Sequence, residues 1–127
     1  MSLNKILIVG DFQYDMYEKA FYDAFKKKGY GVKKFAYHKY INYLTNKPLK
    51  NIVNKIQNKF ALGPKINQLN TDLIKFACNY KPDLIFIYRG RHIKSRTISK
   101  IKQALNGTLI FSYNNDDPFS KNYPSYY

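Results

Sequence analysis

The stretch KILIVG, residues 5–10, decides the fold class of this chain. It is a nearly continuous apolar run, without the polar and apolar alternation of a strand that has one face in water. Such runs are typical of strands buried on both faces of a parallel sheet. A second run, LIFIY, stands at residues 84–88. We therefore expect two interior strands of one parallel sheet.

Apolar residues at helical spacing fill the segments around these two runs. A helix over 14–29, ended by Gly29, would carry one apolar stripe made of Tyr17, Ala20, Phe21, Ala24 and Phe25. Further helices are expected at 48–60, 64–80 and 95–107, the last capped by Gly107. Their apolar positions are Leu49, Val53, Ile56 and Phe60; Ile66, Leu69, Leu73, Phe76 and Ala77; and Ile98, Ile101 and Leu105. Further strands are expected at 31–38 and 108–113.

The resulting order is β-α-β-α-α-β-α-β. Apolar runs joined by amphipathic helices predict an α/β fold with right-handed crossovers. We expect a Rossmann-like open parallel sheet of strand order 2-1-3-4, with helices on both faces. No repeat or linker divides residues 1–127, which we take as one domain.

Composition narrows the function classes. An apolar fraction of 45% favours a globular chain, and no apolar run is long enough to span a bilayer. Cys78 is the only cysteine, which excludes an internal disulfide and fits the cytoplasm. The net charge of +14 suggests nucleic acid or the inner face of a membrane as partners. Because the lysines are scattered along the chain, we interpret them as a solvated surface. Nucleic acid is therefore disfavoured as a partner, and peripheral contact with a membrane stays open.

All three arginines of the chain fall in YRGRHIKSR, residues 88–96. A chain that otherwise uses lysine here concentrates its guanidinium groups. Arginine is preferred where planar, bidentate contact with carboxylate or phosphate is needed. A ligand site and a structural ion pair are both consistent with this cluster.

Three segments should meet at one edge of the predicted sheet, because ligands of open parallel sheets bind beyond the carboxyl ends of the strands. These segments are GDFQYD at 10–15, YRGRH at 88–92 and YNNDDPFS at 113–120. Each also permits a structural interpretation. Asp11 would cap the first helix, Gly90 would allow a tight turn, His92 would be a solvated loop residue, and 114–117 would form an Asx-type turn before Pro118.

Sharper motifs are missing. Neither a G-x-G-x-x-G loop nor a phosphate-binding G-x-x-x-x-G-K-[ST] loop is present, and no Cys/His cluster has metal-ligand spacing. Two adjacent aspartates, Asp116 and Asp117, are weak evidence for a cation site because neighbouring side chains of an extended segment diverge.

Taken together, three stretches resemble a known family: KILIVGDF (5–12), KPDLIFIYRGRHI (81–93) and FSYNNDDPFS (111–120). They are similar to the CgeB-like (spore maturation protein) glycosyltransferases. The first two are generic to many two-domain GT-B glycosyltransferases, and YNNDDPFS is the specific part. The resemblance covers essentially the whole chain, but only the first domain of such an enzyme.

The resemblance implies that residues 1–127 form the N-terminal, acceptor-side half of a glycosyltransferase. Such an enzyme moves a sugar from a nucleotide-sugar donor to a glycan or other cell-surface acceptor. The donor is expected at a second, C-terminal domain, so the chain alone should be inactive. It should need no cofactor and no metal of its own.

The resemblance also implies roles for the rim residues. The candidate bases, in order of preference, are Asp117, Asp116, Asp11 and His92. The residues expected to bind acceptor or phosphate are Asp11, Gln13, Arg89, Gly90, Arg91, Asn114 and Asn115. Two other classes compete with this interpretation: a non-catalytic basic module that binds RNA or an acidic glycan, and a receiver-like regulatory domain.

Overall fold

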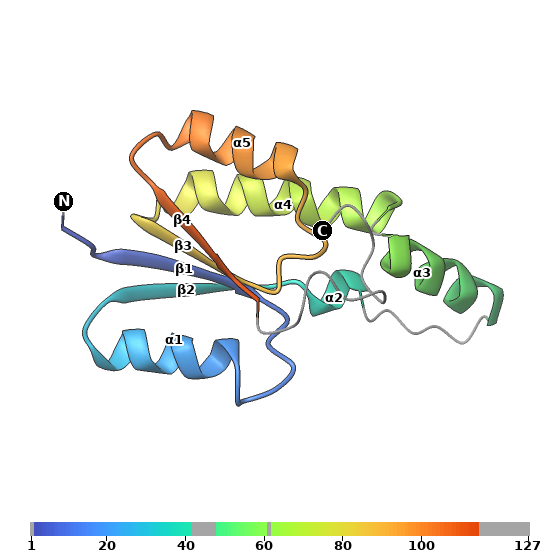
Figure 1. Cartoon of the computed structure of the whole chain (residues 1–127), viewed down its shortest axis with the longest axis horizontal. Coiled ribbons are helices and arrows are strands. Elements are labelled where there is room, and N and C mark those ends of the chain that lie inside the picture. The colour runs from blue at the N-terminus through green and yellow to red at the C-terminus, as the bar shows by residue number, and fades with distance from the viewer. Residues whose placement is uncertain (1, 42–47, 61, 115–127) are drawn as a thin grey trace.

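The computed structural model describes residues 2–41, 48–60 and 62–114 (Figure 1). The strands of this part are β1 (Lys5–Gly10), β2 (Gly31–Ala36), β3 (Leu84–Tyr88) and β4 (Leu109–Tyr113). The helices are α1 (Glu18–Lys27), α2 (His38–Ile41), α3 (Pro48–Phe60), α4 (Pro64–Tyr80) and α5 (Ser95–Ala104). Strands and helices follow the order predicted from the sequence, with the short α2 added.

The described strands form one parallel sheet of order β2-β1-β3-β4, which confirms the predicted topology. In the register of this sheet, Leu7 lies opposite Lys33 on one side and Ile85 on the other. Parallel neighbours need a crossover, and here helices supply each of them. The carboxyl ends of all these strands therefore reach the same edge.

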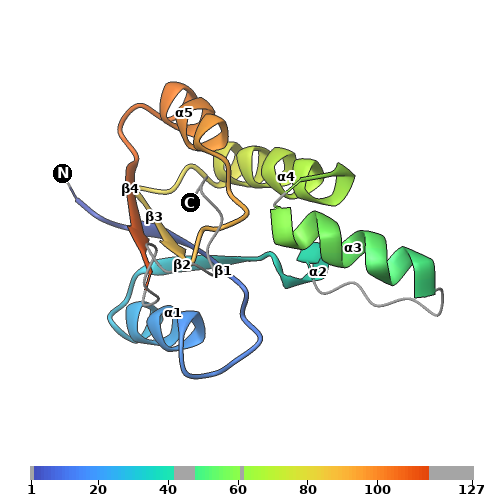
Figure 2. The same ribbon diagram turned by 45° about the vertical axis from the view of Figure 1, so that its right-hand side comes forward.

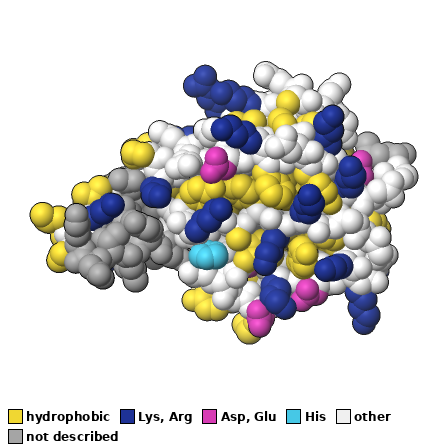
Figure 3. Space-filling view, turned by 180° about the vertical axis from the view of Figure 1, so that it is seen from behind, with side chains coloured by type: hydrophobic (Ala, Val, Ile, Leu, Met, Phe, Trp, Pro, Cys, Tyr) yellow, Lys and Arg dark blue, Asp and Glu magenta, His cyan; other side chains and the backbone are white. Residues whose placement is uncertain are grey.

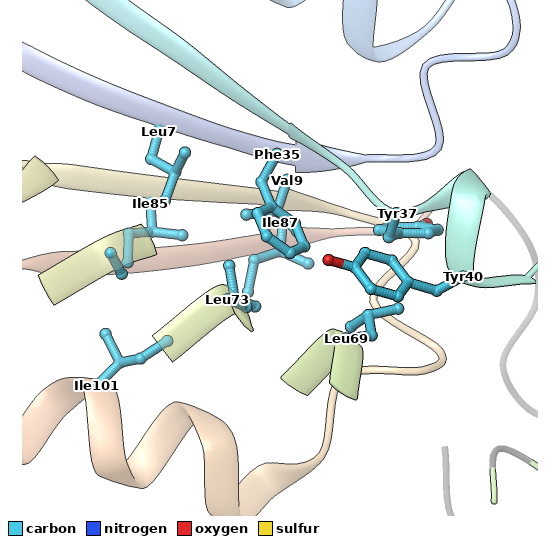
Figure 4. Close-up of a cluster of buried hydrophobic side chains, with 11 residues drawn as sticks. Leu7, Val9, Phe35, Tyr37, Tyr40, Leu69, Leu73, Ile85, Ile87 and Ile101 are labelled. Atoms are coloured by element: carbon cyan, nitrogen blue, oxygen red, sulfur yellow. The ribbon is translucent and has the colours of Figure 1, made fainter. Parts of the chain in front are cut away.

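The sheet lies between two layers of helices, with α1 on one face and α4 and α5 on the other (Figures 1 and 2). Side chains of β1 alternate between these layers. Leu7 and Val9 join the cluster that includes Leu69 and Leu73 of α4 (Figure 4), and Ile6 joins the α1 layer. Residues Ile6 to Val9 are each at most 1% exposed. The predicted burial of this strand on both faces is confirmed.

The apolar stripe predicted for the first helix is only partly correct. Helix α1 begins at Glu18, and of the five predicted members Tyr17 and Phe25 are half-buried while Ala20, Phe21 and Ala24 are exposed. The ring of Phe21 still lies 4.8 Å from that of Phe86. The reason for its exposure is that a single helix covers only part of a face to which four strands contribute.

The other predicted helices are present, with one corrected end. The predicted inward side chains of α4 are buried or half-buried, as are those of α5. Gly29 ends α1 in the left-handed region (φ 91°), as expected. Gly107 does not cap α5 as predicted, because the helix already ends at Ala104 and Gly107 lies outside that region. Thr108 precedes β4, and its hydroxyl donates a hydrogen bond of 2.7 Å to the carbonyl oxygen of Pro82.

Helix α3 matches its predicted bounds, but its described apolar side chains stay outside the core. Figures 1 and 2 show α3 extending from the body of the molecule beside α4. In the ranges that the structure describes, no helix combines the length and hydropathy needed to cross a bilayer.

A buried amide on α4 fixes the loop between β3 and α5. The Nδ2 of Asn70 donates to the carbonyl oxygens of Ile66 (2.8 Å) and His92 (2.9 Å). Its Oδ1 accepts from the Lys94 N–H (2.9 Å) and the Thr97 hydroxyl (2.7 Å). Asn70 therefore binds the first turn of α5 from outside that helix, and satisfied buried amides of this kind are costly to remove.

We expect Asn70→Ala to lower the free energy of unfolding by about 2 kcal/mol, because it strands the buried His92 carbonyl and Thr97 hydroxyl. Asn67→Ala, one turn earlier on α4, is the control. It loses only an exposed bond to Lys94 and should stay within about 0.5 kcal/mol of the wild type. Urea denaturation followed by circular dichroism measures both. Equal losses of unfolding free energy in the two variants would show that the hydrogen bonds of Asn70 do not contribute to stability.

Candidate functional site

The candidate site lies at the edge of the sheet where the parallel strands end. Asp11 follows β1, and Tyr37 and His38 follow β2. Arg89 follows β3, and Asn114 follows β4. The parallel order of the strands brings these ends to one edge, as the sequence predicted for the segments after the first and third strands and, after the fourth strand, as far as Asn114.

Among the described residues of this rim, Asp11 carries a carboxyl whose pKa is shifted from its ordinary value. Its Oδ1 is buried and has no hydrogen-bond partner among the described residues. Burial raises the pKa of this carboxyl, opposed by the positive field of His38; the negative Glu18 raises it further, and Arg89 lowers it. A carboxyl with a raised pKa, close to a cation and an imidazole, holds a proton more readily than an ordinary aspartate, which suits proton transfer.

The loop that carries Asp11 is held by a buried carboxylate. Oε1 of Glu18 accepts from the N–H groups of Asp11 (2.7 Å) and Phe12 (3.1 Å), and Phe12 adopts a left-handed φ of 61°. Gly10 is required here because a Cβ at that position would meet the Glu18 side chain. The helix-cap interpretation of Asp11 is therefore wrong: α1 begins seven residues later, and its own first residue holds the Asp11 backbone.

His38 extends the site to the β2 side. Its Nδ1 lies 2.9 Å from the carbonyl oxygen of Asp11. A carbonyl oxygen only accepts hydrogen bonds, so this contact requires the proton on Nδ1. In the neutral ring Nε2 is then the acceptor, which makes His38 a second group at the rim that can take up a proton.

Arg89 sits in a strained and firmly held turn. Its φ of 55° lies in the left-handed region, which side-chain-bearing residues rarely adopt. The hydroxyl of Tyr37 donates to the carbonyl oxygens of Tyr88 (3.1 Å) and Arg89 (3.0 Å), and the Arg89 N–H donates to Tyr113 (3.0 Å). Strain that its surroundings maintain in this way is common at functional sites.

The guanidinium of Arg89 lies over an aromatic pair. Its centre is 5.4 Å from the ring of Tyr17 and 5.7 Å from that of Tyr88, and these two rings stack on each other. Stacking leaves the edge of a guanidinium able to bind an anion. Gly90 owes its place to close packing: its φ is not positive, and a Cβ there would lie 2.8 Å from Cγ2 of Ile87.

The arginine cluster of the sequence separates in space. Arg89 belongs to the α1 side, with Tyr17. Arg91 lines a hollow of about 280 Å³ beside the start of α5, together with Asn114. Arg96 is exposed on α5 and lines another hollow, between α4 and α5. The arginines therefore do not form one anion site, and Arg89 is the one near Asp11.

The other residues predicted for the site are buried, exposed beside Asp11 or outside the described part of the chain. His92 is only 9% exposed, so the solvated-loop interpretation is wrong, and its carbonyl is bound to Asn70. Gln13 is exposed next to Asp11. Asn115, Asp116 and Asp117 lie outside the described residues, as does most of the proposed Asx-type turn. Among the described residues, no group of three or more His, Cys, Asp or Glu side chains is placed to hold a metal ion.

Sequence reasoning missed His38, Glu18 and Tyr37. His38 had a signal, because it is the last residue of the predicted second strand, 31–38, and the predicted topology sends the carboxyl end of that strand to the same edge. Glu18 and Tyr37 had none. An acidic residue at the start of a helix and a tyrosine at the end of a strand are both common and indicate no particular role. Only the folded backbone brings Glu18 to Asp11 and Tyr37 to Arg89.

Comparison of the chain with protein-family models, curated proteins and solved structures gives no match. The chemistry of the rim is therefore inferred from its own residues. Asp11 and His38 can accept a proton, and Arg89 can hold an anion beside them. Removal of a proton from a hydroxyl next to a bound negative group fits this arrangement.

Two aspartates should change the pH dependence of stability in opposite directions. The raised pKa of Asp11 means that the folded state holds its proton longer, so stability falls as the pH rises from about 4 through the raised value. Asp11→Asn should therefore melt like the wild type at low pH and a few degrees higher at neutral pH. Thermal melts from acid to neutral pH test this.

Asp83 provides the comparison. Its Oδ2 accepts from the N–H groups of Asn4 (2.9 Å) and Lys5 (2.8 Å), and these bonds lower its pKa. That stabilisation is present above about pH 4 and disappears as the pH falls through the lowered pKa. Asp83→Asn should melt below the wild type at neutral pH, with the difference vanishing in acid. Curves of the same sign for both variants would contradict the assignment.

Proposed function

We propose that this chain is the N-terminal, acceptor-side domain of a CgeB-like, GT-B glycosyltransferase. The observation that carries the proposal is the rim: a proton-accepting carboxyl, Asp11, beside the anchored cation Arg89, at the carboxyl ends of a parallel 2-1-3-4 sheet. This fold matches the domain that the sequence resemblance implies. The enzyme transfers a sugar from a nucleotide sugar to a hydroxyl of a glycan or other cell-surface acceptor.

The rim residues divide the work as follows. A base removes the proton of the acceptor hydroxyl, and the candidates are Asp117, Asp116 and Asp11. His92 falls behind them because it is buried, and His38 takes its place. Arg89 holds an anionic acceptor or the departing diphosphate. Asn114 and Asn115 orient hydroxyl groups, and Arg91 binds on the α5 side.

The two edge strands of the sheet differ in charge. This difference supports the proposal that a further part of such an enzyme covers β4. Edge strand β2 carries Lys33 and Lys34, whose ammonium groups lie over the rings of Tyr80 and Phe12. Lysines on an edge oppose strand addition. Edge strand β4 has no charged residue, and its Phe111 is 53% exposed.

The alternative function is a non-catalytic module that binds RNA or an acidic glycan through its basic surface. The net charge of +14 favours it. Figure 3 shows Lys and Arg side chains spread on both sides of a hydrophobic stripe on the β2 side of the molecule. Binding of this kind weakens linearly with the logarithm of the salt concentration and shows no preference among sugars.

Titration of the 127-residue chain followed by NMR separates these functions. On the proposal, a hydroxyl-rich anionic sugar shifts the amide signals of Asp11, Phe12 and Arg89. A nucleotide sugar binds weakly or not at all, because its site is in the second domain. Tight binding of a nucleotide sugar to this chain would overturn the domain assignment. Binding of RNA with a steep salt dependence and no response at the rim would favour the alternative.

Replacement of one aspartate tests the motif YNNDDPFS in an enzyme that contains both domains. Asp117→Asn should keep the melting temperature and lower turnover by about 10²-fold, the usual scale for loss of a general base. Asp116→Asn is the control, because in an extended segment adjacent side chains would point apart. If both variants transfer sugar at the wild-type rate, the base is elsewhere, and Asp11→Asn becomes the decisive variant.

A further inference from the structure

Helix α3 presents an apolar face to solvent. Leu49 is 79% exposed, Ile52 54%, Val53 50% and Ile56 52%. On the neighbouring helix α4, by contrast, Ile66, Leu69 and Leu73 are fully buried. Helix α3 packs against α4, and that contact leaves these four side chains in water. A single exposed leucine is ordinary, but an ordered apolar face is not.

The four residues lie on one side of the helix. A rotation of about 100° per residue places them within an arc of roughly 100°. The same rotation places Lys50 about 60° beyond one side of this arc and Lys55 about 60° beyond the other. Lysines that flank an apolar arc can extend their ammonium groups away from it while their stems stay apolar.

The surroundings of α3 in the chain carry positive charge without any negative charge. From Ala24 to Thr71 the sequence holds no Asp or Glu, whereas lysines occur throughout. Figure 3 shows hydrophobic and Lys or Arg side chains together at the end of the molecule where α3 lies. An apolar face with lysines on both flanks fits a surface that has an apolar interior and anionic groups at its boundary with water.

We propose that α3 docks this protein on an anionic membrane surface, lying in the plane of the interface. Leu49, Ile52, Val53 and Ile56 enter the boundary of the acyl chains, and Lys50 and Lys55 bind lipid phosphates. The helix is amphipathic and of modest length, so it lies on the bilayer. This inference uses none of the rim residues and does not depend on the proposed transferase activity.

Charge decides between a membrane and the other occupants of such a face. A second copy of the chain would bring the same lysines against each other, and like charges across an interface oppose association. A protein groove would have to supply acidic groups along both flanks of the helix. An anionic bilayer supplies negative charge in every direction around the apolar arc, which matches lysines on both sides.

Cosedimentation of the whole chain with vesicles tests the proposal. Vesicles of phosphatidylcholine alone should bind little, and an equimolar mixture with phosphatidylglycerol should bind strongly, less so in high salt. The double variant Ile52→Asn, Ile56→Asn should lose about tenfold or more in partitioning. Leu109→Asn with Phe111→Asn, which changes exposed apolar residues of β4, is the control and should bind like the wild type.

A second pair of variants separates local charge from net charge. Lys50→Gln with Lys55→Gln should weaken binding to the anionic vesicles by about tenfold. Lys75→Gln with Lys100→Gln removes the same charge from exposed positions on α4 and α5 and should have little effect. Equal losses from the two pairs would overturn the proposal in favour of general attraction by the +14 charge.

A spectroscopic measurement reports the position of the helix directly. The chain has no tryptophan, so Ile56→Trp introduces a single probe on the apolar face. Its emission should shift to shorter wavelength with the mixed vesicles, while Phe111→Trp should not respond. No shift, or self-association through Ile52 and Ile56 without vesicle binding, would overturn the proposal.

Discussion

Burial of β1 on both faces is the constraint on which the rest of the structure depends. Ile6 to Val9 have no polar side to turn to water, so helices must cover the sheet above and below them. Parallel pairing with β2 and β3 satisfies the backbone of β1 and forces a helical crossover on each side. The same pairing sends every carboxyl end to one edge, which is why the polar rim exists at all.

Buried polar side chains then give that edge its shape. Glu18 holds the backbone after β1, Tyr37 holds the turn after β3, and Asn70 holds the start of α5. Each acts from an element that does not itself carry the group it positions. Because a buried polar group that loses its partner is costly, these contacts fix the loops more strictly than apolar packing alone would. The strained φ of Arg89 is one result.

The apolar surfaces that remain uncovered have different surroundings. On β2, lysine side chains lie across aromatic rings and protect the edge. On β4, Leu109 and Phe111 are exposed on a strand that itself carries no charged residue, which suits contact with another protein part. On α3, Ile52 and Ile56 stand between lysines, which suits a lipid surface. A strongly basic chain can thus direct separate apolar faces to different partners through the charges around each.

The sequence alone determined the fold class, the strand order, the element bounds to within a few residues and the edge that carries the polar loops. It could do so because continuous apolar runs and helical spacing are local signals that survive without knowledge of neighbours. The tertiary structure decided four further features. Arg89 is separated from Arg91 and Arg96, and His38 belongs to the rim. Glu18 anchors Asp11, and α3 is exposed. These depend on contacts between residues distant in sequence and on how far a helix reaches over a sheet, and no local pattern encodes either.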